Sequence, residues 1–107
     1  MKRFAVFGNP INHSLSPMIH NEFANELGIE LSYEKILSPI GDFALTANEF
    51  IKDGGLGLNI TVPFKLDAFN FSEELTSNAR AAGAVNTIKV KNKVIYGENT
   101  GMSGLSI

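Results

Sequence analysis

Short apolar runs of strand length alternate along this chain with longer apolar stripes of helical spacing, and this alternation constrains the fold most strongly. Residues 4–7, 31–37 and 56–62 are predicted to form strands. Residues 15–27 and 43–51 place apolar side chains three and four positions apart, as one face of a helix requires. Strands that alternate with helices form a mostly parallel sheet, because each crossover helix packs back on it.

The last third of the chain departs from this alternation. Residues 72–82, which are rich in alanine and glutamate, predict a helix that Gly83 ends. Residues 84–90 and 94–96 predict two strands joined by a short polar turn, which is the pattern of a hairpin. The sequence therefore predicts an α/β fold in three layers: a mostly parallel sheet flanked by helices, with an antiparallel strand pair near the C-terminus.

Size and composition favour a single domain that folds without cross-links. Of the 107 residues, 44% are hydrophobic, which is enough apolar side chain to form a core. Only 19% are charged, which is too little for a disordered chain. There is no cysteine, which excludes disulfides and thiol nucleophiles and fits a cytoplasmic location. The net charge of −2 predicts no nucleic-acid partner, and no apolar run has the length of a signal peptide or a membrane span.

Polar side chains gather around the predicted strand 56–62. Asn59 and Thr61 share one face of this strand, and Lys65 follows its carboxyl end, which is the ligand-binding edge of open α/β sheets. Hydroxyls, amides and one ammonium group suit a small anionic ligand rich in oxygen. The alternative is that Asn59 and Thr61 belong to a solvated strand face and that Lys65 is an ordinary surface lysine.

Further candidates lie elsewhere in the chain. Ser14 and Ser16 precede the first predicted helix, where turn formation and helix capping are the commoner roles of serine. Asn86 interrupts an apolar strand, and a buried amide there needs a hydrogen-bond partner. His13 in a loop and His20 on a helix do not suggest a metal pair, so no metal site is predicted.

The glycines do not predict a dinucleotide site. Gly54, Gly55 and Gly57 precede or lie within a strand instead of following one, and Gly101 and Gly104 lack the third glycine and a following helix and strand. The chain alone is therefore predicted to bind neither a nicotinamide nor a flavin.

Four blocks of sequence resemble the substrate-binding domain of the shikimate dehydrogenase family. They occur in the family's order, and the resemblance runs from about Phe4 to Leu105. The blocks are AVFGNPI at 5–11 continuing to HSLSP at 13–17, NITVPFK at 59–65, AGAVNT at 82–87 and GENT at 97–100.

This resemblance implies an enzyme of two α/β domains that reduces 3-dehydroshikimate to shikimate with NADPH, on the pathway to chorismate and the aromatic amino acids. Residues 1–107 would form the substrate-binding domain, and the NADP-binding Rossmann domain would be absent from this chain. The resemblance also implies that Ser14 and Ser16 bind the substrate carboxylate. Thr61, Lys65 and Asn86 would bind the ring hydroxyls, with Lys65 as the catalytic acid and base.

The sequence departs from the family after Asn-Thr, where Gly101 replaces an aspartate that pairs with the lysine. Because this carboxylate and the cofactor domain are missing, we expect the chain alone to be inactive and to bind shikimate weakly. We also expect it to self-associate through the exposed inter-domain surface. The alternative is a stand-alone binding or regulatory module for a hydroxylated carboxylate such as shikimate or quinate.

Overall fold

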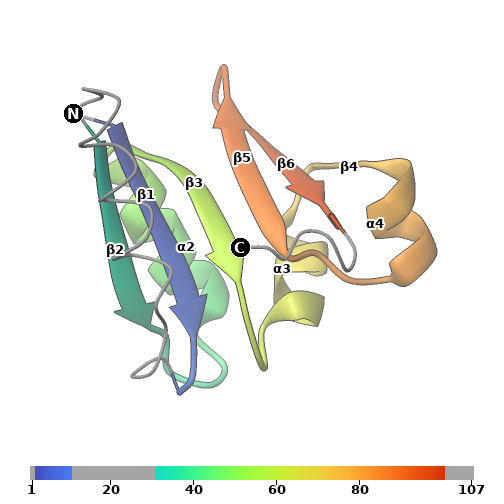
Figure 1. Ribbon diagram of the computed structural model, residues 1–107, viewed down its shortest axis with the longest axis horizontal. Helices are drawn as coiled ribbons and strands as arrows, with labels where there is room; N and C mark the ends of the chain where they lie inside the picture. Colours follow the sequence, from blue (N-terminus) through green and yellow to red (C-terminus); the bar gives the residue numbers. More distant parts are fainter. Residues whose placement is uncertain (1, 11–30, 101–107) are drawn as a thin grey trace.

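The computed structural model describes residues 2–10 and 31–100, which form a mixed β-sheet with helices packed against it (Figure 1). The strands lie in the order β2-β1-β3-β5-β6-β4. β1 pairs in parallel with β2 and β3, β4 pairs in parallel with β6, and β5 runs antiparallel to both β3 and β6. Their bounds are β1 Lys2–Gly8, β2 Leu31–Leu37, β3 Gly55–Ile60, β4 Glu74–Leu75, β5 Thr87–Lys91 and β6 Val94–Glu98.

The described helices are α2 (Phe43–Lys52), α3 (Lys65–Phe71) and α4 (Ser77–Ala82). α2 and α3 contribute buried side chains to one continuous core with β1, β3 and β5, so both cover the same face of the sheet. The predicted fold class, an α/β sheet flanked by helices, is confirmed. The β3–β5 pairing adds a second antiparallel contact to the predicted hairpin. The helix predicted over residues 15–27 lies outside the described residues.

Between β3 and β5 the structure differs locally from the sequence prediction. A single helix was expected over residues 72–82, but only its second half is helical. The first half pairs with β6: the Glu73 N–H donates to the Ile95 carbonyl (2.9 Å) and the Thr76 N–H to the Gly97 carbonyl (3.0 Å). These ladder bonds hold the backbone extended until the Thr76 side chain caps α4.

α4 ends at the glycine that the sequence predicted, whereas α3 begins after an aromatic residue, where no helix was predicted. Gly83 ends α4 in the left-handed conformation, with φ of 66°, as predicted.

α3 was not predicted, because residues 64–65 were assigned to a turn. Phe64 starts this helix: its N–H donates to the Thr61 carbonyl (3.0 Å), and its own carbonyl accepts from the Ala68 N–H (2.8 Å).

Phenylalanine rings form the centre of the core. Phe7 on β1 meets Phe43 and Phe50 of α2 edge to face, with ring centroids 5.8 Å apart in both pairs. Phe43 also stacks on Phe64 at 5.5 Å. Because Phe64 is fully buried, the residue before α3 is fixed by the core, and so is the place where Lys65 begins the helix.

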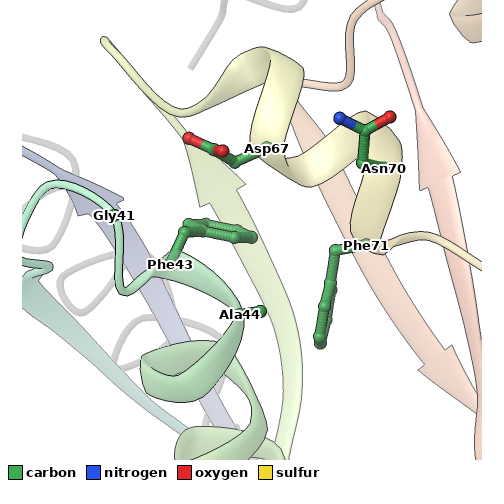
Figure 2. Close-up of a pocket in the computed structure, with 6 residues that line it drawn as sticks. All are labelled: Gly41, Phe43, Ala44, Asp67, Asn70 and Phe71. Atoms are coloured by element: carbon green, nitrogen blue, oxygen red, sulfur yellow. The ribbon is translucent and has the colours of Figure 1, made fainter.

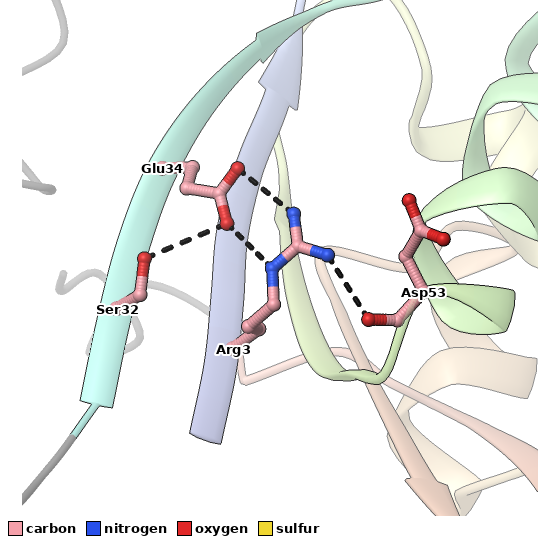
Figure 3. Close-up of polar contacts among 4 residues, drawn as sticks. All are labelled: Arg3, Ser32, Glu34 and Asp53. Atoms are coloured by element: carbon pink, nitrogen blue, oxygen red, sulfur yellow. Dashed lines mark hydrogen bonds and ion pairs between the residues drawn. The ribbon is translucent and has the colours of Figure 1, made fainter. Parts of the chain in front are cut away.

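The amino ends of the strands are joined by Arg3 of β1 (Figure 3). Its Nε and Nη2 donate to the two carboxylate oxygens of Glu34 on β2 (2.8 and 3.0 Å), and its Nη1 donates to the Asp53 carbonyl after α2 (3.1 Å). The hydrogen bond to Glu34 is the main cause that raises the pKa of the guanidinium. This contact ties β1, β2 and α2 together at one end and leaves the carboxyl ends of the strands free of it.

Replacing Phe64 with alanine should destabilise the domain strongly. A buried phenylalanine replaced by alanine costs about 3 to 5 kcal/mol, because the core cannot fill the cavity. The matched control is Leu66→Ala, whose side chain is 61% exposed and whose loss should change the free energy of unfolding by about 0.5 kcal/mol or less. Urea unfolding measures both, and equal losses in the two variants would contradict the anchoring role of Phe64.

Candidate functional site

The carboxyl ends of the three parallel strands are held together by backbone and amide contacts. The Asn9 N–H donates to the Val62 carbonyl (3.0 Å), which joins the turns after β1 and β3. The Asn9 Nδ2 donates to the Ser38 carbonyl (3.1 Å), and the Ser38 N–H donates to the last carbonyl of β1 (3.2 Å). Both turns contain a cis proline bond, Asn9-Pro10 and Val62-Pro63. The three strands therefore end at one edge, as predicted.

Three of the predicted site residues lie on segments that adjoin at this edge. The Val85 N–H donates to the Lys65 carbonyl (3.0 Å), and the Ile60 N–H donates to the Asn86 carbonyl (2.8 Å). Thr61 follows Ile60 directly, so Thr61, Lys65 and Asn86 lie on three adjoining segments. Lys65 is exposed, whereas Thr61 and Asn86 are half-buried. Ser14 and Ser16 lie outside the described residues.

The Asn86 side chain is hydrogen-bonded to the end of the β5–β6 hairpin. Its Oδ1 accepts from the Thr87 hydroxyl (3.0 Å), the Thr100 backbone N–H (3.1 Å) and the Thr100 hydroxyl (3.3 Å). The prediction that this amide needs a partner is confirmed. Asn86 was expected inside a strand, but β5 begins one residue later, so Asn86 stands at the strand's amino end.

Asn59 is held by Tyr33, a residue that the sequence did not single out. The Tyr33 hydroxyl, on β2, donates to the Asn59 Oδ1 on β3, across the intervening strand β1. The Tyr33 ring is 7% exposed and packs against Val6 and Phe4 on the face opposite the main core. Burial raises the pKa of Tyr33 to about 12. The sequence signal for this contact was a tyrosine within the predicted strand 31–37, because a buried tyrosine hydroxyl usually has a hydrogen-bond partner.

A separate open pocket lies between α2 and α3 (Figure 2). Its volume is about 360 Å³, and Asp67 and Asn70 of α3 are its polar lining residues. None of the predicted site residues lines this pocket. Its lining consists of Gly41, Phe43, Ala44, Asp67, Asn70 and Phe71.

Residues 6–88 match the family described as the shikimate dehydrogenase substrate binding domain. This chain belongs to that family. The resemblance of the four sequence blocks to this substrate-binding domain is therefore confirmed.

Curated relatives extend well beyond this substrate-binding domain. The shikimate dehydrogenase (NADP(+)) of Ruthia magnifica subsp. Calyptogena magnifica is 63% identical over 105 residues, which are 98% of this chain and 39% of that protein. The enzyme of the same name from Chromobacterium violaceum is 53% identical over 103 residues, which are 96% of this chain and 38% of that protein. The chain thus spans about two fifths of the length of these relatives.

Solved structures show the same fold. Shikimate 5-dehydrogenase of Thermus thermophilus, crystallised with NADP(H) and shikimate, matches with a TM-score of 0.89 and 36% identity over 97% of this chain and 40% of its own. Shikimate dehydrogenase of Aquifex aeolicus matches with a TM-score of 0.91 and 31% identity over 97% of this chain and 39% of its own.

The described turns of this substrate-binding domain do not fit NADP. A dinucleotide site needs a glycine-rich turn from a strand into a helix, where backbone N–H groups meet the pyrophosphate. The turn into α2, residues 38–42, contains one glycine, and the turn into α3, residues 61–64, contains none. In residues 2–10 and 31–100 no group of three acidic or histidine side chains could hold a metal ion, and no helix is long and apolar enough to cross a membrane.

The raised pKa of Tyr33 predicts a loss of stability at alkaline pH. Between pH 10 and 12 the unfolded chain releases the Tyr33 proton while the folded domain keeps it, so the free energy of unfolding falls as the pH rises through this window. Tyr33→Phe should remove this part of the fall. A tyrosinate absorbance titration should also lose its late step in Tyr33→Phe, which retains Tyr96 as its one tyrosine. A Tyr33 that titrates near pH 10 would contradict its burial.

Proposed function

We propose that this domain binds shikimate and 3-dehydroshikimate through Thr61, Lys65 and Asn86, as the substrate-binding part of an NADP-dependent shikimate dehydrogenase in aromatic amino acid synthesis. One observation supports the proposal: the backbone bonds from Val85 to Lys65 and from Ile60 to Asn86 join the segments that carry Thr61, Lys65 and Asn86 at one sheet edge. The names of the relatives supply the reaction.

The chemistry of these groups suits a ring that carries several hydroxyls. Lys65 offers three N–H donors on a long, exposed side chain, and Thr61 offers a hydroxyl that both donates and accepts. Beside the reacting oxygen, Lys65 would donate a proton when a carbonyl becomes a hydroxyl and remove it in the reverse direction. Ser14 and Ser16 complete the proposal as ligands of the substrate carboxylate, on the strength of the family motif alone.

Residues 1–107 by themselves are proposed to bind substrate without turning it over. The sequence has no dinucleotide fingerprint, and Gly101 stands where the family motif has an aspartate. We further propose a cytoplasmic location, which the absence of cysteine favours.

Self-association of residues 1–107 is part of this proposal. Four exposed apolar side chains lie near the same carboxyl edge. One is the last residue of β2, and the others lie in the segments that follow β2 and β3; their exposed fractions range from 57% to 68%. Apolar surface of this kind favours association when nothing covers it. The side chains are Leu37, Ile40, Val62 and Leu66.

Lys65→Met should weaken shikimate binding by roughly tenfold to a hundredfold, because a hydrogen bond from a charged donor contributes about 1.5 to 3 kcal/mol. The matched control is Lys52→Met, which removes an exposed ammonium group from the last turn of α2. Isothermal titration calorimetry with shikimate gives both dissociation constants. Equal affinities for wild type and Lys65→Met would exclude Lys65 from the site.

Gly101→Asp should strengthen shikimate binding by roughly threefold to tenfold, the effect of one added hydrogen-bond acceptor for a ligand hydroxyl. Met102→Asp adds the same charge one position later, and its affinity for shikimate should equal that of the wild type. Calorimetry under identical conditions compares the two variants. The same gain in both would show a general effect of charge and would refute a specific role for the family's aspartate.

A further inference from the structure

We propose that Thr87 and Thr100 are positioning residues that fix the side chain of Asn86 as a hydrogen-bond donor to the substrate. This inference rests on the function proposed above and deepens it, because it assigns the hydrogen-bond polarity of one contact. It concerns two threonines that act through Asn86 and need not touch the substrate themselves.

The Thr100 backbone N–H determines the orientation of the Asn86 amide. A backbone N–H can only donate, so the side-chain atom 3.1 Å from the Thr100 nitrogen must be the amide oxygen. The oxygen and nitrogen of a planar amide lie on opposite sides of the same carbon. With Oδ1 directed at Thr100, the Nδ2 group of Asn86 is directed to the other side.

The amide oxygen of Asn86 is fully used as a hydrogen-bond acceptor. Oδ1 has two lone pairs and already accepts from three groups, the Thr87 hydroxyl and the Thr100 hydroxyl and backbone N–H. A ligand hydroxyl therefore finds no acceptor on this oxygen. Asn86 can meet a substrate only through its Nδ2 hydrogens, and the ring oxygen that it contacts must act as an acceptor.

The sheet anchors Thr87 and the backbone of Asn86. Thr87 opens β5 and is paired on both sides, with Asn59 of β3 and Glu98 of β6. The Asn86 N–H itself donates to the Glu98 carbonyl (3.0 Å). The amide is thus held from the sheet, and its orientation is set before any ligand arrives, which reduces the entropy lost on binding.

Thr87→Val tests this inference, because valine keeps the β-branched shape and loses only the hydroxyl. We expect shikimate affinity to fall by roughly threefold to tenfold, the range for one hydrogen bond. Thr87→Ser, which keeps the hydroxyl, should restore it. Thr46→Val is the matched control: it removes a hydroxyl that donates to the Asp42 carbonyl at the start of α2 (2.9 Å) and that is not among the groups bonded to Asn86.

A double-mutant cycle separates positioning from a merely structural role. In an Asn86→Ala background, Thr87→Val should have no further effect on affinity, because the group it orients is gone. The Asn86 side-chain amide signals in ¹H–¹⁵N NMR spectra should shift in Thr87→Val without ligand. If Thr87→Val fails to fold, Thr100→Val, at an exposed position, carries the same expectations.

Unchanged shikimate affinity in folded Thr87→Val and Thr100→Val would overturn the inference. An equal loss of affinity on Thr87→Val in the wild-type and the Asn86→Ala backgrounds would also overturn it. Failure of the proposed function is distinguishable: the wild-type domain would then not bind shikimate, or would bind it equally well without Lys65.

Discussion

The stacking of Phe43 on Phe64 is the contact on which the site depends. It joins α2 to the residue that starts α3, and the ring centroids lie 5.5 Å apart. The Phe64 ring is fully buried and the Phe64 N–H donates to the Thr61 carbonyl, so this one residue fixes both Thr61 before it and Lys65 after it. The aromatic core therefore determines the positions of the polar residues at the sheet edge. It fixes the backbone of Lys65, while the ammonium group at the end of this long side chain stays in water.

The mixed topology of the sheet explains how Asn86 comes to this edge. In a purely parallel sheet only the carboxyl ends of strands meet there. β5 runs antiparallel to β3, so the start of β5 lies beside the end of β3, and Asn86 immediately precedes β5. The Arg3–Glu34 ion pair joins β1 and β2 at the opposite end. This ion pair and the candidate binding groups are thus separated along the strands.

Much of this arrangement could be predicted from local sequence. Residues 31–37 and 43–51 carry strong periodic patterns, and their elements appear within one residue of the predicted bounds. The division of residues 72–82 into β4 and α4 could not be predicted, because ladder bonds to β6 override helix propensity. Thr61, Lys65 and Asn86 were singled out as polar residues in or after predicted apolar strands, and the family motif then gave them substrate roles. Tyr33 was not singled out, since its partner Asn59 lies on a non-adjacent strand and no local pattern records that contact.

Backbone amide chemical shifts, followed as shikimate is added to ¹⁵N-labelled protein, test the central claim most directly. The account predicts shifts that saturate with ligand and cluster at Thr61, Lys65 and Asn86, with little change at Arg3 and Glu34 at the other end of the sheet. Saturable shifts confined to the pocket between α2 and α3, or no shifts at millimolar shikimate, would contradict the assignment of the carboxyl edge as the substrate site.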